Sequence, residues 1–268
     1  MPGISKVFSA ELDGIEAKLI EVETDINVGL HSFTIVGLAD KALSEAKERV
    51  NSALKNIGVK APNKENRKIV VNLAPADIKK AGSQYDLAIA LGFLLASGQI
   101  KDFDSENKIF VGELSLAGML RPVNGALSIA RLAKKKGFDC IFVPKENAVE
   151  AAIIPGITVF PVGHLEDLIK HLEERKPITP QPTTKINYAF AGDFPDFSEI
   201  KGQEHAKRAL MIAAAGGHNL IMVGPPGTGK TMLAQALNSI LPDPSLEEVI
   251  EMTQIHSSAG VLGEQPYI

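Results

Sequence analysis

The spacing of apolar residues along the first two thirds of the chain predicts alternating helices and short strands. Between residues 39 and 57 the apolar positions repeat every three or four residues and Gly58 follows, which predicts an amphipathic helix with a glycine after its end. These repeating positions are Leu43, Ala46, Val50, Leu54 and Ile57. Further helices are predicted over 87–96, 126–135 and 165–172, and strands over 69–73, 109–111 and 140–143. Alternating elements of this kind predict a layered α/β domain over residues 1–172.

The composition of the chain changes after the last of these helices. Residues 173–184 are first charged and then rich in proline and threonine, which indicates an extended linker that we place at 173–189. The second region, 190–268, opens with a predicted helix over 204–215 that two glycines end. Ser245 followed by Glu248 is the pattern of a capping box, which predicts a further helix to about residue 255.

Residues 224–231 match the phosphate-binding loop pattern G-x-x-x-x-G-K-[ST]. The eight residues are Gly224, Pro225, Pro226, Gly227, Thr228, Gly229, Lys230 and Thr231. The apolar run 219–223 before the loop predicts a buried strand, and the apolar residues between 232 and 240 recur at helical spacing. A strand, a glycine-rich turn and a helix in this order form the context in which the pattern binds nucleotide.

The residue types of the loop suit the chemistry of a nucleoside triphosphate. Backbone N–H groups of the turn bind phosphate oxygens, and glycines leave the approach open. The start of the following helix adds its positive dipole end. We expect Lys230 to reach the β- and γ-phosphates and the Thr231 hydroxyl to bind Mg²⁺, so the predicted cofactors are ATP and Mg²⁺.

Charge and cysteine content limit the other classes of function. The net charge is −4, so the chain has no overall basic character of the kind that grips nucleic acid unaided. The single cysteine, Cys140, excludes an internal disulfide and lies in an apolar run, which predicts a buried thiol in a reducing compartment. The N-terminus has no signal-peptide pattern, and the longest apolar stretch, 87–97, is too short to span a bilayer. We therefore expect a cytoplasmic protein that has no membrane partner.

A complete nucleotide-hydrolysing domain needs more than its loop. It also needs an acidic residue after a second strand for Mg²⁺ and a group that positions the attacking water. Only about forty residues follow Lys230, too few for the rest of a doubly wound sheet. Glu247, Glu248 and Glu251 read as an exposed helix face rather than as catalytic groups. The sequence thus indicates a whole first domain and the opening part of an ATPase, truncated after it.

Several long segments, in the right order, resemble the magnesium-chelatase-like branch of the AAA+ ATPases and, more narrowly, the ComM/YifB family. They are FTIVGLAD at 33–40, NLAPAD at 72–77, FSEIKGQEHAKRAL at 197–210, AAAGGHN at 213–219 and TQIHSSAG at 253–260. The resemblance implies an α/β fold: an α+β N-terminal domain of the ribosomal-S5-domain-2-like or Lon-like type, then the first part of a P-loop AAA+ domain. It also implies that Gln203 lies near the adenine, although Gln203 can equally be a polar residue in the first turn of a helix.

The same resemblance implies a function for the full-length family. Members of the family are hexameric AAA+ motors linked to branch migration of DNA in natural transformation and recombination. No position of this chain matches the acidic strand, the sensor or the arginine finger of such a motor, so the catalytic residues are not assigned. Two alternatives stay open, namely a non-enzymatic module that serves assembly or nucleotide binding and a metal-chelatase motor subunit.

One segment of the first domain, GELSLAGMLRPV at 112–123, resembles the Lon protease domain, which suggests a peptidase with a serine nucleophile and a lysine base. The register places Gln84 at the nucleophile and Leu127 at the lysine, and neither can perform that chemistry. Ser83 with Lys79 or Lys80 could mimic such a pair, but we expect these lysines to be solvated. A role in assembly or partner contacts is therefore expected.

Overall fold

The computed structural model describes residues 4–37, 41–62, 66–80, 82–187, 195–263 and 266–268. It divides into two compact units. The front unit comprises residues 1–186 together with 248–268, and the phosphate-loop unit comprises residues 187–247. The domain boundary that we expected at residue 190 falls within 188–194, outside the described residues. Residues 248–268, which the sequence placed with the second region, are grouped here with the front unit.

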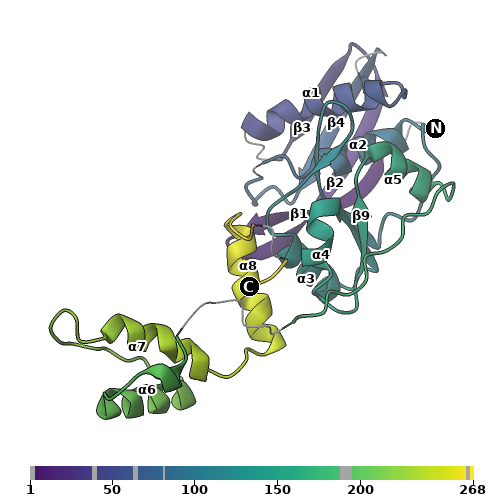
Figure 1. The fold of residues 1–268 in the computed structure, drawn as a ribbon. Helices are drawn as coiled ribbons and strands as arrows, with labels where there is room; N and C mark the ends of the chain where they lie inside the picture. Colours follow the sequence, from purple (N-terminus) through teal and green to yellow (C-terminus); the bar gives the residue numbers. More distant parts are fainter. Residues whose placement is uncertain (1–3, 38–40, 63–65, 81, 188–194, 264–265) are drawn as a thin grey trace. The chain divides into compact units, whose positions relative to one another are not determined.

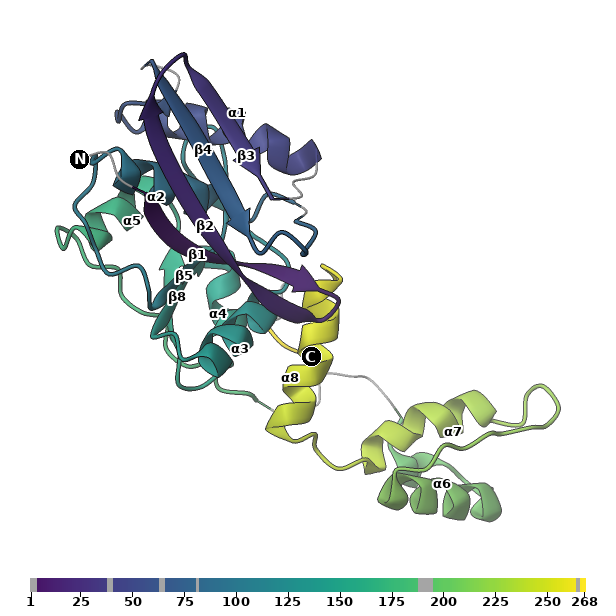
Figure 2. The same cartoon turned by 180° about the vertical axis from the view of Figure 1, so that it is seen from behind.

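A mixed seven-stranded sheet with the order β3-β4-β2-β1-β5-β8-β9 forms the middle layer of the front unit (Figures 1 and 2). Its strands are β1 (Ser5–Asp13), β2 (Glu16–Val28), β3 (Ser32–Val36), β4 (Arg67–Ala74), β5 (Lys108–Phe110), β8 (Cys140–Pro144) and β9 (Thr158–Val162). The pairs β1–β2 and β2–β4 are antiparallel and the other four pairs are parallel. A separate small hairpin consists of β6 (Glu113–Leu114) and β7 (Leu120–Arg121).

The long hairpin of β1 and β2 is the largest part of the fold that sequence analysis missed, along with β3, β9 and the short strands β6 and β7. Asp13 pairs with Glu16, so the turn between the strands has two residues, and its first residue, Gly14, has a φ of 65°. Glycine at the first position of a two-residue turn is a hairpin signal, because glycine adopts positive φ at no steric cost. In β2, burial alternates between Ile20 and Ile26, as expected for a strand with one face in the core. Both signals were present in the sequence.

Helices lie on both faces of the sheet, although Figure 2 shows no helix, among the described residues, over the second face of β3 and β4 (Figures 1 and 2). On one face α1, α2 and α5 enclose the larger hydrophobic cluster, and on the other face α3 and α4 enclose the second. These helices are α1 (Lys41–Asn56), α2 (Asp86–Ala96), α3 (Ala126–Lys136), α4 (Ala148–Ala151) and α5 (Leu165–Leu172), and a short 3-10 helix, η2 (Lys145–Asn147), precedes α4. Val7 and Phe8, adjacent in β1, point into different clusters because successive side chains of a strand face opposite sides.

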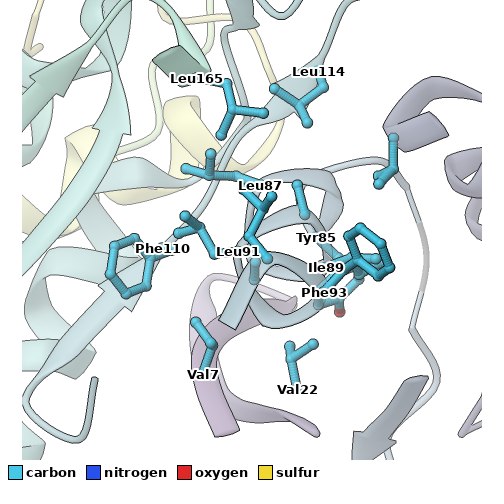
Figure 3. Packing of buried hydrophobic residues seen from close by; sticks show 14 of the residues in the cluster. Val7, Val22, Tyr85, Leu87, Ile89, Leu91, Phe93, Phe110, Leu114 and Leu165 are labelled. Atoms are coloured by element: carbon cyan, nitrogen blue, oxygen red, sulfur yellow. The ribbon is translucent and has the colours of Figure 1, made fainter. Parts of the chain in front are cut away.

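Helix α2 lies at the centre of the larger cluster, and Figure 3 shows its side chains surrounded on several sides. Every residue of α2 except Leu95 is buried. Val7 and Val22 of the sheet, Phe110 of β5, Leu114 of β6 and Leu165 of α5 belong to the same cluster. A helix that is apolar all round must be enclosed. Each of its large side chains then contributes about 1.5–3 kcal/mol through burial.

The predicted α/β class is confirmed, and most predicted elements lie where the spacing of apolar residues placed them. Helices α1, α2, α3 and α5 and strands β4, β5 and β8 match their predicted ranges to within a few residues, while residues 39 and 40 of the first predicted helix lie outside the described residues. Cys140 is buried as expected, and burial raises the pKa of its thiol to about 11.

A buried ion pair joins α1 to the beginning of α2. The Asp86 carboxylate is fully buried and accepts hydrogen bonds from Arg49 Nε at 2.6 Å and Arg49 Nη2 at 3.1 Å. The backbone N–H of Leu114 also donates to Asp86 Oδ2, at 3.1 Å. Burial raises the pKa of Asp86 to about 6, and the bonds from Arg49 and Leu114 partly offset this effect. One carboxylate thus ties α1, α2 and β6 together.

Removal of the Arg49 side chain should destabilise the front unit strongly. Arg49→Ala leaves a buried carboxylate without its charged partner, and such a loss costs about 3–5 kcal/mol. Arg121→Ala is the matched control, because Arg121 pairs with Glu113 at 3.0 Å but is 62% exposed, and an exposed pair contributes less than about 1 kcal/mol. Urea unfolding measures both free energies. Equal losses in the two variants would contradict the structural role assigned to Asp86.

The raised pKa of Asp86 also predicts how stability depends on pH. Because the folded state holds the proton of Asp86 more tightly than the unfolded state does, this group favours folding below its unfolded pKa. That contribution is lost as the pH rises from about 4 to about 6. Wild type should therefore lose stability relative to Asp86→Asn across this window. Urea unfolding of both proteins at several pH values measures the free energy of unfolding of wild type minus that of Asp86→Asn. This difference should fall as the pH rises, and a rise would contradict the prediction.

Candidate functional site: a phosphate-binding loop

The phosphate-loop unit has a small core built from helices. Its elements are η3 (Phe197–Glu199), α6 (Glu204–Gly216), α7 (Lys230–Ala236) and η4 (Leu237–Ile240). Ile200, Leu210, Leu233 and Ala236 form the buried centre, with Met222 packed against it. Helix α6 confirms the helix predicted over 204–215, and Gly217 after it has a φ of 61°, the left-handed conformation that ends many helices. The core therefore holds α6 against α7, the helix that follows the loop.

Two glycines give the loop its backbone shape. Gly227 has a φ of 80° and Gly229 a φ of 83°, a region that residues with a side chain rarely adopt. Neither position has a neighbouring atom within 4 Å of where a Cβ would stand, so conformation rather than lack of space requires glycine. The Thr228 hydroxyl donates to the carbonyl of Pro225 at 3.0 Å, and Leu233 N–H donates to Gly229 O at 2.9 Å, which starts α7.

Lys230 is the first residue of α7, and its ammonium group reaches back over the loop. Nζ donates to the carbonyls of Gly224 at 2.9 Å and Pro225 at 2.6 Å, and lies 3.4 Å from the Thr228 hydroxyl oxygen. Thr231, the next residue of the helix, is exposed. A glycine-rich turn that carries an ammonium group at the start of a helix is an arrangement suited to binding phosphate.

Gln203 links the beginning of α6 to the loop. It precedes α6 with a φ of 59°, which is uncommon for a residue with a side chain. Its side-chain amide donates to the carbonyl of Thr228 at 3.4 Å. The structure thus brings Gln203 to the loop from another element, and the contact with adenine that the family resemblance implies stays a prediction.

The predicted strand over 219–223 is wrong for this structure. These residues form neither helix nor strand, and no strand pairs with them among the described residues of the phosphate-loop unit. Ile221 is 87% exposed and Val223 is 90% exposed. A strand exists only when neighbouring strands bond to its backbone, and a strand that is apolar on both faces requires a covered sheet. Apolar sequence alone therefore did not produce the strand.

The glutamates at 247, 248 and 251 are exposed, as expected.

The groups that could mimic a serine–lysine pair bond to other residues of the front unit. Ser83 donates to the Glu113 carboxylate, and Gln84, at the nucleophile position, donates to Glu11 at 2.9 Å. The expectation that both lysines are solvated is wrong for Lys80, which is fully buried and donates to the carbonyl of Pro75. Desolvation lowers the pKa of Lys80. Its burial was missed because tertiary packing, which no local pattern reveals, encloses it.

Two family models match the chain in succession. The model described as subunit ChlI of Mg-chelatase matches residues 22–147, and the model described as magnesium chelatase, subunit ChlI, matches residues 196–268. The second match contains the whole phosphate-binding loop and Gln203.

Among the described residues, no helix is long and apolar enough to cross a membrane.

Curated relatives support the same family. The uncharacterized protein YifB of Escherichia coli is 44% identical over 245 residues, which cover 91% of this chain and 47% of YifB. Competence protein ComM of Haemophilus influenzae is 41% identical over 254 residues, which cover 94% of this chain and 49% of ComM. A Lon protease of Buchnera aphidicola is 24% identical over 183 residues, 65% of this chain and 23% of the protease.

The fold, the loop and these matches together define a magnesium-chelatase-like protein. Within that class, the chain belongs to the family of ComM and YifB. The chain spans about half the length of these two relatives.

Proposed function

We propose that the phosphate-loop unit binds ATP together with Mg²⁺. The observation that carries this proposal is the geometry of the loop, in which two left-handed glycines shape the turn and the Lys230 ammonium lies over its carbonyls. Membership of the magnesium-chelatase-like family supports the proposal, because the matched region includes every residue of the loop. The eight loop residues, with Gln203, form the proposed nucleotide site.

Each residue of the proposed site has a separate task. The N–H groups of the loop bind phosphate oxygens, and Lys230 neutralises charge on the β- and γ-phosphates. The Thr231 hydroxyl would hold Mg²⁺, which supplies charge neutralisation between the phosphates when it is bound. Gln203, already bonded to the loop through Thr228, would meet the adenine side of the nucleotide. For these contacts to form, the Lys230 ammonium exchanges carbonyl partners for phosphate oxygens.

The whole protein is proposed to be an ATP-driven motor that acts on DNA. One relative is named a competence protein, and the family resemblance implies a role in processing DNA during natural transformation and recombination. In this proposal residues 1–172 form a non-catalytic Lon-like domain, 173–189 a linker and 190–268 the beginning of the AAA+ domain. The acidic strand, sensor and arginine finger would come from the remaining length of a ComM-like protein. The protein would act as a hexameric ring in the cytoplasm.

A second function, a non-enzymatic module for assembly, is favoured by the surface of the phosphate-loop unit. Besides Ile221 and Val223, the large apolar residues Met211, Ile212 and Met232 are each about half exposed. Exposed apolar surface of this extent is typical of an incomplete core or of a contact with another chain. In this alternative the unit is incompletely folded without further strands, and any nucleotide that it binds is not used to drive a motor.

Loss of the Lys230 ammonium should abolish nucleotide binding. Lys230→Ala should weaken the affinity for a fluorescent ATP analogue by about a hundredfold or more, because a charge-assisted contact to phosphate is lost. Lys185→Ala removes the same charge from an exposed linker position and should leave the affinity unchanged. Fluorescence titration in the presence of Mg²⁺ measures both variants. Wild-type affinity in Lys230→Ala would show that the site assignment is wrong.

Limited proteolysis should separate the motor part from the assembly module. If the unit folds around ATP, saturating ATP with Mg²⁺ should slow cleavage between residues 195 and 247, because the ligand binds only the folded state. Lys230→Ala should show no such protection. A protected core that ends before residue 187 with or without ATP favours the assembly module. Mass spectrometry of the fragments identifies the cleavage sites.

A further inference from the structure

Helix α8 (Leu246–Ser258) follows the phosphate-loop unit in the chain, but from Glu248 onward it belongs to the front unit. It lies beside α3 in both views (Figures 1 and 2). Its buried residues are Val249, Ile250, Thr253, Gln254 and Ser257. The spacing of these five places them on one helical face, and three of them are polar. The helix lies within the region matched by the second family model, whereas α3 lies within the region matched by the first.

Glu150 of α4 is the centre of the surface that receives α8. Its carboxylate is buried and accepts a hydrogen bond from the Ser257 hydroxyl of α8. It also accepts from the backbone N–H of Leu127, at 2.9 Å, and the Ser257 hydroxyl oxygen in turn accepts from Gly125 N–H at 3.0 Å. Burial raises the pKa of Glu150, and these donors partly offset the effect. One carboxylate therefore links α4, the start of α3 and α8.

Gln254 makes the second polar contact one turn earlier on α8. Its amide nitrogen donates to the Ser128 hydroxyl at 3.1 Å, and its amide oxygen accepts from Arg131 Nη1 at 2.5 Å. Only Ile250 of α8 joins the buried apolar cluster under α3. We name the receiving surface, formed by Gly125, Ser128, Arg131 and Glu150, the α8 seat.

The chemistry of the α8 seat differs from that of the core around α2. When a helix leaves an apolar core, apolar surface becomes exposed to water, which is strongly unfavourable. When α8 leaves its seat, the polar groups on both sides can form hydrogen bonds to water instead, so the cost is smaller. Packing beside the seat is also incomplete. A cavity of about 370 Å³ adjoins Glu150, Ser257 and Gly260, and the buried hydroxyl of Ser258 has no hydrogen-bond partner among the described residues.

We propose that the α8 seat is a reversible docking site through which the front unit holds the segment that follows the phosphate-loop unit. The partner is α8 itself, recognised through the hydroxyl of Ser257 and the amide of Gln254. Only residues 241–245 join η4 to α8. When α8 occupies the seat, it therefore restrains the end of the phosphate-loop unit to which it is connected. The docking proposal does not depend on nucleotide binding.

Hydrogen exchange of the intact chain tests this proposal. In wild type, amides of α8 should exchange about tenfold or more faster than those of α2, because α8 can open without unfolding of the core. Ser257 and Leu127 both donate to Oε1 of Glu150, so Glu150→Gln keeps an oxygen for them but removes the negative charge that strengthens both bonds, and it turns an amide donor toward the Asn147 amide. It should accelerate exchange in α8 by a further tenfold or so, as expected when buried bonds to a charged group become bonds to a neutral one, and leave α2 unchanged.

Glu251→Gln is the matched control, because Glu251 lies on the exposed side of α8 and undergoes the same chemical change. It should leave exchange in α8 within about twofold of wild type. Gln254→Ala, a second variant that leaves the front unit intact, should accelerate α8 as Glu150→Gln does. Equal rates for α8 and α2 in wild type, or acceleration of both helices together in the two seat variants, would overturn the proposal. So would unchanged α8 rates in both.

Discussion

The enclosure of helix α2 is the constraint on which the front unit depends. The helix has no polar face, so strands of the sheet, α1 and α5 must together cover it on all sides. This requirement places the sheet against one side of α2. Asp86 begins this helix inside the protein and needs Arg49 for its charge. Core packing and one ion pair thus fix how α1, α2 and β6 lie relative to one another. The other face of the sheet is then free to hold α3 and α4, which carry the α8 seat.

The two units differ in how their structure is stabilised. The front unit has two large buried clusters, whereas the buried centre of the phosphate-loop unit has four side chains. The loop keeps its shape despite this small core because its conformation is local, set by left-handed glycines and by hydrogen bonds within a few residues. Residues 219–223 before it have no such local support. The conformation of the loop can therefore form without a paired strand before it.

The residues that the resemblance to the Lon protease domain would place at catalytic positions have structural partners in the front unit. The Gln84 side chain donates to Glu11, and the Leu127 backbone N–H donates to Glu150. Ser83 and Lys80 have different partners. The polar groups of this region bond to one another, as buried polar groups generally do. Buried polar groups are also paired with one another at the α8 seat, where the hydrogen bonds join segments that are distant in the sequence.

Local sequence determined the elements whose cause is local. Periodic apolar residues fixed α1, α3 and α5, glycines fixed helix ends, and the phosphate loop was evident from residues 224–231 alone. The hairpin of β1 and β2 was also predictable, from the glycine at the first position of its turn and from the alternating apolar residues of β2. Tertiary structure decided the burial of Lys80, the pairing of Arg49 with Asp86 and the seating of α8, because each depends on which distant segments meet. It also decided against the strand at 219–223, since a strand forms only where another strand accepts its hydrogen bonds.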